Sequence, residues 1–165
     1  MRERILVLGD GLFDGLPGLP ERVPVLMLED LELCTRVRHH RQKLVLYLAS
    51  MRRFRDRLRA EGREVAYVEL NESGDETFLD RLSERLDGTE RLFVHRINDA
   101  YLREGLRARL DDLGIELTEA ESPMFVTSPD DWAAYRKRRK RLRMSEFYQD
   151  QRLRLGLLVE NGKPT

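Results

Sequence analysis

Residues 37–70, VRHHRQKLVLYLASMRRFRDRLRAEGREVAYVEL, decide the fold, because a long amphipathic segment is followed there at once by a short apolar one. In the first part, apolar residues recur at spacings of three, four and seven from Val37 to Leu58, and Gly62 follows where a helix would end. The second part, residues 64–70, has the near-continuous apolar character of a strand covered on both faces. A helix followed by a buried strand predicts part of an α/β fold with a parallel sheet.

Four further segments have strand character, three of them as near-continuous apolar runs, and helical patterns separate most of the five. The five predicted strands cover residues 5–9, 23–29, 64–70, 91–95 and 115–119. Helical periodicity returns over residues 78–86 and again over 102–113, where Gly114 follows. Residues 10–22 hold three glycines and two prolines and are predicted to form a loop or a short helical turn. The order β-β-α-β-α-β-α-β predicts an open, twisted, parallel sheet with right-handed crossovers.

The last part of the chain has a different organisation. Ser128 and Pro129, with the two acids that follow, make a typical helix start. Helices are predicted over residues 129–141 and 144–155. We therefore expect an α/β domain at residues 1–121 and a segment of linker helices at residues 122–165.

Composition narrows the class of protein. Thirty basic residues balance thirty acidic ones, so the whole chain has no general attraction to nucleic acid or to an anionic membrane. The single cysteine, Cys34, excludes an internal disulfide framework and a cysteine-based zinc site, and it favours a reducing compartment. No apolar run approaches the roughly 20 residues that span a bilayer. We expect a cytoplasmic protein that makes no membrane contact.

Ligands of open α/β sheets bind outside the carboxyl ends of the strands, so position selects the candidate binding residues. The first strand ends at Gly9, Asp10, Gly11 and Leu12. There the glycines would let the backbone approach a flat ligand, and Asp10 would accept hydrogen bonds from it. In the alternative, the glycines only turn the chain and Asp10 caps the next segment.

Two more candidates end the second and fourth strands, namely Glu29 and His95. Glu29 belongs to an acidic group with Asp30 and Glu32, for which solvated loop acids are the simpler interpretation. No Ser-His-Asp or Cys-His arrangement can be defended in this sequence. We therefore find no self-sufficient catalytic set.

A basic cluster, RVRHHRQK at residues 36–43, falls at the start of the predicted long helix, where the helix dipole disfavours cations. The acids after the second strand, a phosphate or flavin-like ligand, or another domain would each explain it, and an internal ion pair is the simplest explanation. His39 and His40 suggest a metal site. However, adjacent helical residues point about 100° apart and do not easily share one ion.

A second basic feature is the run of six consecutive cations at residues 136–141. Six in a row surround a helix with charge, which is incompatible with burial unless acidic partners are present. The functional hypothesis is contact with nucleic-acid phosphates through Arg138, Arg139 and Arg141. The alternative is a solvated helix balanced by the acid-rich body of the chain.

Three stretches together resemble the amino-terminal domain of the deoxyribodipyrimidine photolyase-related proteins, the bacterial cryptochrome/photolyases of the prokaryotic (6-4) photolyase type that carry an iron–sulfur cluster. They are ILVLGDGL at residues 5–12, the segment 37–70 quoted above, and SPMFVTSPDDWAAYRKRRKRLRMSEFYQDQRLRLGLLVENGKPT at residues 122–165. The specific elements are HH-R-x-K, SMR-x-F, and RM-x-x-FY followed by GLL. The match spans essentially the whole chain in the right order.

The resemblance implies a Rossmann-like sheet of five parallel strands in the order 3-2-1-4-5, with helices on both faces. In the family this domain holds an antenna chromophore, commonly 6,7-dimethyl-8-ribityllumazine. The resemblance implies that a ligand here would sit among Asp10, Leu12, Arg36, Tyr47 and the loop after the fourth strand.

The resemblance also implies that this chain is not catalytic by itself. In the family a larger C-terminal domain, absent from this chain, binds FAD and a 4Fe-4S cluster and repairs ultraviolet lesions in DNA. The implied partners are that C-terminal photolyase domain and, through the parent protein, damaged DNA.

Three ligand-side segments depart from the family pattern. The family's first loop usually has GDQL, where this chain has Gly11 at the amide position. Leu33 and Arg36 stand where the family often has an acidic and an aromatic residue, and residues 96–99 replace an EPGE-type loop. Two alternatives therefore stay open: a structural domain that has lost its antenna site, and a free-standing module that binds a nucleotide or nucleic acid.

Overall fold

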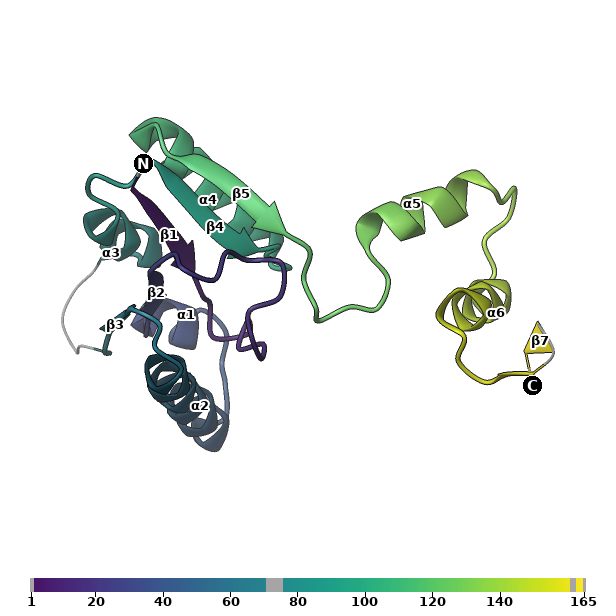
Figure 1. Cartoon of the computed structure of the whole chain (residues 1–165), viewed down its shortest axis with the longest axis horizontal. Coiled ribbons are helices and arrows are strands. Elements are labelled where there is room, and N and C mark those ends of the chain that lie inside the picture. Colours follow the sequence, from purple (N-terminus) through teal and green to yellow (C-terminus); the bar gives the residue numbers. More distant parts are fainter. Residues whose placement is uncertain (1, 71–75, 161–162, 165) are drawn as a thin grey trace. The chain divides into compact units, whose positions relative to one another are not determined.

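The computed structural model describes residues 2–70, 76–160 and 163–164. The chain divides into two compact units, Met1–Pro123 and Met124–Thr165, both drawn in Figure 1. Among the described residues, the first unit contains a five-stranded sheet with four helices, and the second contains two helices and a short hairpin.

A parallel sheet forms the centre of the first unit. β1 lies in its middle, because Ile5 pairs with Val25 of β2 on one side and with Phe93 of β4 on the other. All four residues of β2 are buried, as expected for a strand covered on both faces. The fold class and the strand order expected from the sequence are confirmed, with the order β3-β2-β1-β4-β5. The strands are β1 (Glu3–Leu6), β2 (Val25–Leu28), β3 (Val65–Val68), β4 (Arg91–His95) and β5 (Glu116–Ala120).

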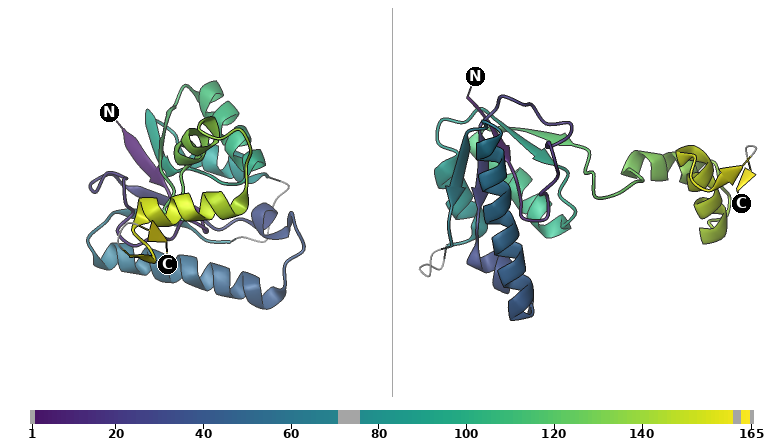
Figure 2. Two further views of the ribbon diagram at one scale, coloured as in Figure 1. Left: turned by 90° about the vertical axis from the view of Figure 1, so that its right-hand side faces the viewer. Right: turned by 60° about the horizontal axis from the view of Figure 1, so that its bottom comes forward.

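Helices cover both faces of this sheet (Figures 1 and 2). On one face, α3 (Phe78–Arg85) and α4 (Ala100–Leu113) share an apolar cluster with the sheet, and α1 (Leu31–Thr35) packs Leu33 against it. On the other face, α2 (Arg41–Ala60) buries Met51, Phe54 and Leu58. These three residues follow the helical spacing that the sequence shows.

The connection between β1 and β2 takes the place of a helix on the α2 face. Leu16 and Leu19 of this loop are buried in the same cluster as the core residues of α2. Leu16 adopts a φ of 47°, a conformation that costs a non-glycine residue about 1–2 kcal/mol. Burial of a leucine side chain contributes about 1.5–3 kcal/mol and offsets that strain. The segment forms turns, which is one of the two predicted alternatives.

The predicted start of the long helix at Val37 is wrong, because α2 begins at Arg41. His40 is its N-cap: the backbone there is extended, and the imidazole Nδ1 accepts a hydrogen bond from the Gln42 N–H at 3.2 Å. The short helix α1 precedes this cap and was not predicted. Its signal was Asp30, whose carboxylate caps α1 by accepting from the Leu33 N–H at 3.0 Å.

The second unit consists of α5 (Pro129–Lys137), α6 (Met144–Leu155) and a hairpin of β6 (Val159–Glu160) and β7 (Lys163–Pro164). Ser128 and Asp131 form the capping box at the start of α5, and α6 has the predicted bounds. α5 ends at Lys137, so its predicted extension to Arg141 is wrong. The next cations leave the helix, and two of them, Arg138 and Arg139, reach acids of α6.

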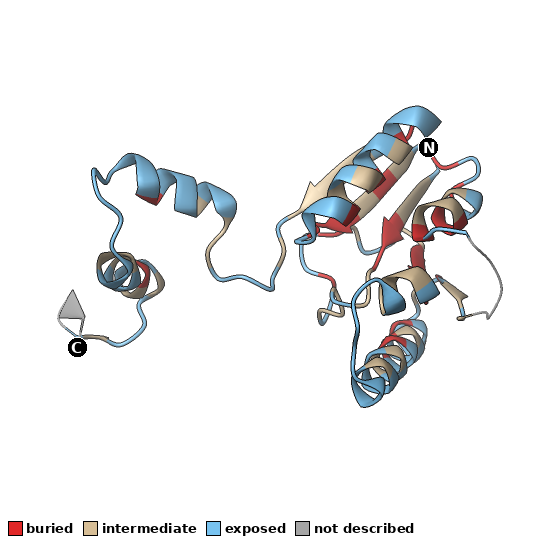
Figure 3. Cartoon of the chain, turned by 180° about the vertical axis from the view of Figure 1, so that it is seen from behind, coloured by how far each residue is buried: buried red, intermediate tan, exposed pale blue. Residues whose placement is uncertain are grey.

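Few side chains are buried in the second unit. The rings of Trp132, Tyr135 and Phe147 cluster with centroid distances of 5.0–5.9 Å. Within its described residues only Tyr135 and Gln151 are buried, and Figure 3 shows both helices mostly in the colours of exposed and intermediate residues. Throughout the described ranges of the chain, no helix has the length and apolar character needed to cross a membrane.

Candidate ligand site at the carboxyl edge of the sheet

A cavity of about 250 Å³ lies at the carboxyl ends of β1 and β2. Residues at and after the ends of these strands line it, together with α1, His39 and α2 as far as Met51. Its lining is mostly apolar, with a few polar groups among it. The carboxyl edge is where open α/β sheets bind their ligands. The lining residues are Leu8, Gly9, Leu28, Asp30, Leu33, Cys34, His39, Lys43, Leu44, Tyr47, Leu48 and Met51.

Tyr47 lies against the backbone of Gly9, and this contact explains why a glycine stands there. A Cβ atom at Gly9 would come within 2.6 Å of the Tyr47 hydroxyl oxygen and would also overlap the ring. Burial, with a smaller effect of the Asp10 charge, raises the pKa of Tyr47 to about 12. The hydroxyl therefore keeps its proton at neutral pH and can donate a hydrogen bond to a ligand.

The other residues of the predicted GDGL site do not line the cavity. The Gly11 N–H donates to the Leu8 carbonyl at 2.9 Å, and Leu12 packs on the apolar cluster of the α2 face. Burial raises the pKa of Asp10 above its ordinary value, although its backbone hydrogen bond opposes this effect. Of this motif, Gly9 lines the cavity, and Asp10 lies near enough to affect the phenol of Tyr47 electrostatically.

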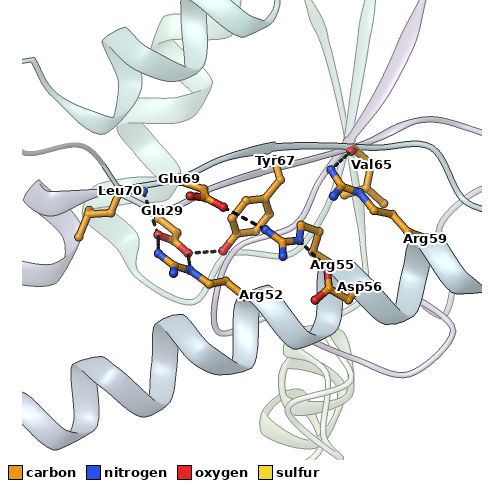
Figure 4. Close-up of polar contacts among 9 residues, drawn as sticks. All are labelled: Glu29, Arg52, Arg55, Asp56, Arg59, Val65, Tyr67, Glu69 and Leu70. Carbon is orange, nitrogen blue, oxygen red and sulfur yellow. Dashed lines mark hydrogen bonds and ion pairs between the residues drawn. The ribbon is translucent and has the colours of Figure 1, made fainter.

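Glu29 has a structural task that the sequence did not indicate (Figure 4). Its carboxylate is fully buried and accepts two hydrogen bonds from the Arg52 guanidinium at 2.6 and 2.8 Å. It also accepts from the Tyr67 hydroxyl at 2.5 Å and from the Leu70 N–H at 2.9 Å. Burial alone would raise the pKa of Glu29, but these bonds hold it at about 2. Glu29 thus ties β2 to α2 and β3, and it does not line the cavity.

The interpretation of the neighbouring acids as solvated loop residues is wrong. The Asp30 carboxylate is buried and accepts a hydrogen bond from the Arg81 guanidinium at 2.8 Å. The Glu32 carboxylate accepts from the Phe78 N–H at 2.7 Å, at the start of α3. A carboxylate that is withdrawn from water needs such partners. Here α3 supplies both of them, through the Arg81 side chain and the Phe78 N–H.

Two other predicted ligand residues do not line the cavity. Arg36 forms an ion pair with Asp99 and lies over the Tyr101 ring, 5.0 Å from its centroid. The buried His95 places its Nε2 atom 2.8 Å from the Pro17 carbonyl oxygen, and its ring meets Phe13 edge to face. Both side chains connect loops at the carboxyl edge. The structure brings only Gly9 and Tyr47 of the eight candidates into the cavity lining.

The basic cluster of residues 36–43 divides into two parts. Arg36 has the internal ion pair that the sequence favoured. Arg38, His39, Arg41 and Lys43 make no side-chain hydrogen bond or ion pair within the described parts of the chain, and His39 and Lys43 line the cavity. No group of three potential metal-ligating side chains occurs among the described residues, so the histidine pair has no third ligand there.

The run at residues 136–141 also divides into two parts. Arg138 lies 3.5 Å from Asp150, and Arg139 lies 3.7 Å from Glu146, so both side chains reach α6. In the described part of the chain, Arg136, Lys137, Lys140 and Arg141 have no acidic partner. Of the three predicted phosphate contacts, only Arg141 thus has no acidic partner among the described residues.

A sequence model of the family "Deoxyribodipyrimidine photo-lyase-related protein" matches residues 5–165. The chain belongs to this family. Among curated proteins, this chain is similar to the "(6-4) photolyase" of Agrobacterium fabrum (strain C58 / ATCC 33970), with 24% identity over 171 residues. That alignment covers 99% of this chain and 34% of the relative. The photolyase-related chain therefore spans about a third of the length of this relative.

Sequence reasoning missed several residues that line the cavity of this photolyase-related chain. Leu44, Leu48 and Met51 were assigned to the core because of their helical spacing. The sequence did contain a signal for them. The start of α2 has more apolar residues than one face of the sheet can cover, so some of them are expected to stay exposed or to line a cavity. Cys34 and Lys43 could not be placed, because the α1 helix and the late start of α2 were not predicted.

Proposed function

We propose that this chain is the N-terminal antenna-chromophore-binding domain of a longer, flavin-dependent photolyase or cryptochrome, and that it has no catalysis of its own. The cavity at the carboxyl ends of β1 and β2 is the observation that carries this proposal. The family match and the third of the relative's length that the chain covers support it. The activity implied for the parent protein is DNA repair.

The residues of the cavity fit a flat ring. Its volume of about 250 Å³ is below the roughly 300–1,000 Å³ of pockets for drug-sized ligands, so it suits a compact ring system. Leu44, Leu48 and Met51 would contact the ring faces, and the Tyr47 hydroxyl would donate to a ring oxygen or nitrogen. Gly9 leaves room for this arrangement. The bound chromophore, 6,7-dimethyl-8-ribityllumazine or another antenna pigment, would supply light absorption.

Titration of the purified chain with 6,7-dimethyl-8-ribityllumazine tests this function. We expect quenched ligand fluorescence and a shifted absorbance band with the native protein. The variant Leu44→Trp fills the cavity and should abolish both signals. Leu46→Trp is the matched control, because Leu46 lies on the same helix, is 69% exposed and does not line the cavity. Absence of any signal with the native chain would count against a lumazine antenna, and failure of other antenna pigments to bind as well would favour a structural domain that has lost its antenna.

The parent protein's C-terminal domain, with FAD and a 4Fe-4S cluster, is the proposed partner of the second unit. That unit exposes ten large apolar side chains while burying one aromatic ring in its described residues, and unusually large exposed apolar surfaces mark interaction sites. The gene tests the idea directly: its reading frame should continue past codon 165 into a helical domain with several cysteines. A stop codon there would contradict this arrangement. The exposed apolar residues are Met124, Phe125, Val126, Trp132, Leu142, Met144, Tyr148, Leu153, Leu157 and Leu158.

A second candidate function, contact with DNA phosphates, rests on the unpaired cations of the 136–141 run. Removing two of them in the double variant K140Q/R141Q should lower the slope of log affinity against log salt by about 1.8, at about 0.9 per phosphate contact. The control R53Q/R85Q removes two exposed arginines of the first unit that have no ion pair within the described residues. Equal binding by both variants would exclude Lys140 and Arg141 as DNA contacts.

A further inference from the structure

We propose that the ligand of the cavity carries an anionic, phosphate-type tail, which the basic side chains at the start of α2 bind. This inference rests on the proposed function, because it names the chemical class of the ligand at the same site. Its starting point is that two of these side chains, His39 and Lys43, line the cavity itself. Lys43 thus brings a positive charge to a lining that is mostly apolar, and the His39 imidazole adds a hydrogen-bonding group there.

The local charge around the cavity is one-sided. From Leu33 to Arg55 the sequence contains no acidic residue, while basic residues recur throughout. Asp30, an acid in the cavity lining, bonds to Arg81 of α3. Asp10 remains nearby, and burial raises its pKa and so disfavours its charge. Nothing among the described acids balances the cations at the start of α2.

The arginines on either side of this cluster have acidic partners, which the cations of the cluster itself lack. Arg36, at the end of α1, pairs with Asp99, and Arg52, further along α2, pairs with Glu29. Between them, Arg38, Arg41 and Lys43 have no such partner within the described ranges. Cations are stabilised by anions that they can contact directly, and phosphate oxygens accept strong charge-assisted hydrogen bonds from them. A phosphate at the mouth of the cavity would supply the missing partner.

The volume of the cavity indicates which part of such a ligand lies inside it and which part extends outside. A cavity of about 250 Å³ has room for a compact ring system and is below the range for whole drug-sized molecules. The ring would occupy the part lined by Leu44, Leu48 and Met51. Its tail would extend toward Lys43 and His39. The chemical class is therefore a flat heteroaromatic ring with a phosphorylated side chain.

Riboflavin and flavin mononucleotide are suitable probes, because they share one ring and differ only by the terminal phosphate. We expect flavin mononucleotide to bind at least about tenfold more tightly than riboflavin at 50 mM salt. The advantage should shrink at 500 mM salt, because screening weakens exposed charge contacts. The double variant R41Q/K43Q should weaken binding of flavin mononucleotide and remove its advantage over riboflavin. The control R53Q/R85Q, which removes the same charge elsewhere, should keep the advantage.

The outcomes separate this inference from the proposed function. Equal affinity for the two flavins overturns the phosphate tail and leaves the cavity as a ring-binding site. Binding of the ribityllumazine without binding of either flavin also overturns it, because that ligand carries no phosphate. If none of the three probes binds, the proposed function fails, and this inference fails with it. A titration with inorganic phosphate alone shows whether the cations bind the anion without the ring, and competition with flavin mononucleotide is then expected.

Discussion

Replacing Glu29 with glutamine should destabilise the first unit strongly at neutral pH. Glutamine has the shape of the protonated glutamate, so the variant removes the charge while keeping most of the packing. The pKa of Glu29 is held at about 2, against an ordinary value of 4.5. Because each pKa unit corresponds to about 1.36 kcal/mol, the ionised form contributes about 3 kcal/mol to folding at pH 7.

The pH dependence has a definite sign. The pKa of Glu29 is lower in the folded than in the unfolded state, so its stabilisation is complete above the unfolded value and is lost as pH falls toward 2. The difference between the native chain and E29Q should be about 3 kcal/mol at pH 5 and about 1.4 kcal/mol at pH 3. Near pH 2 it should fall below about 0.5 kcal/mol.

Urea unfolding followed by far-ultraviolet circular dichroism measures these differences. The only tryptophan, Trp132, belongs to the second unit, so its fluorescence serves as an internal reference that E29Q should not change. The control is E69Q, since Glu69 is 64% exposed and pairs with Arg55 at 3.3 Å. That substitution should cost less than about 1 kcal/mol. A loss below 1 kcal/mol for E29Q at pH 7, or a loss that does not shrink by pH 3, would refute the reasoning.

Two other substitutions test the core and the cavity. Leu58→Ala, at a position 1% exposed in the α2-face cluster, should cost about 2–5 kcal/mol in urea unfolding. Leu46→Ala on the same helix should stay within about 0.5 kcal/mol of the native chain, and similar losses for the two would show that α2 does not pack as described. Gly9→Ala should displace the Tyr47 ring and lower its pKa from about 12 toward the ordinary value of about 10. Absorbance at 295 nm measures this titration, with Tyr47→Phe to identify the signal, and an unchanged pKa in Gly9→Ala would contradict the contact.

The fold was predictable because its determinants are local and repeated. Four of the five predicted strands are short apolar runs, and spacings of three and four residues mark the long helix up to Leu58. The predictions that failed concern the helix boundaries that depend on a single capping side chain. The start of α2 depends on the hydrogen bond from the Gln42 N–H to His40, and α1 depends on Asp30 as its cap. The sequence analysis considered His40 for a metal site and interpreted Asp30 as a solvated loop acid, so neither residue was identified as a cap.

The candidate site was less predictable, because its residues have partners far away in the sequence. Glu29 meets Tyr67 and the Leu70 N–H, and His95 meets the Pro17 carbonyl. Strand ends identify the edge of the sheet at which a ligand binds, but they do not show which polar side chains already have internal partners. Gly9, selected as a glycine at a strand end, and Tyr47, named because of the family resemblance, both line the cavity, and their role in ligand binding stays a prediction.

The balance of charge shows how an average over the chain can mislead. The neutral chain consists of a first unit with twenty basic and twenty-five acidic residues and a second unit with ten basic and five acidic residues. The zero total therefore says nothing about what either unit attracts. The cations that our two binding proposals rest on are among those left without an internal ion pair in the described residues, namely Arg38, Arg41 and Lys43 in the first unit, and Lys140 and Arg141 after α5. Because charge acts over about 10 Å at 0.1 M salt, we expect each group of cations to act locally, so that neutralising either group leaves the other's proposed binding unchanged.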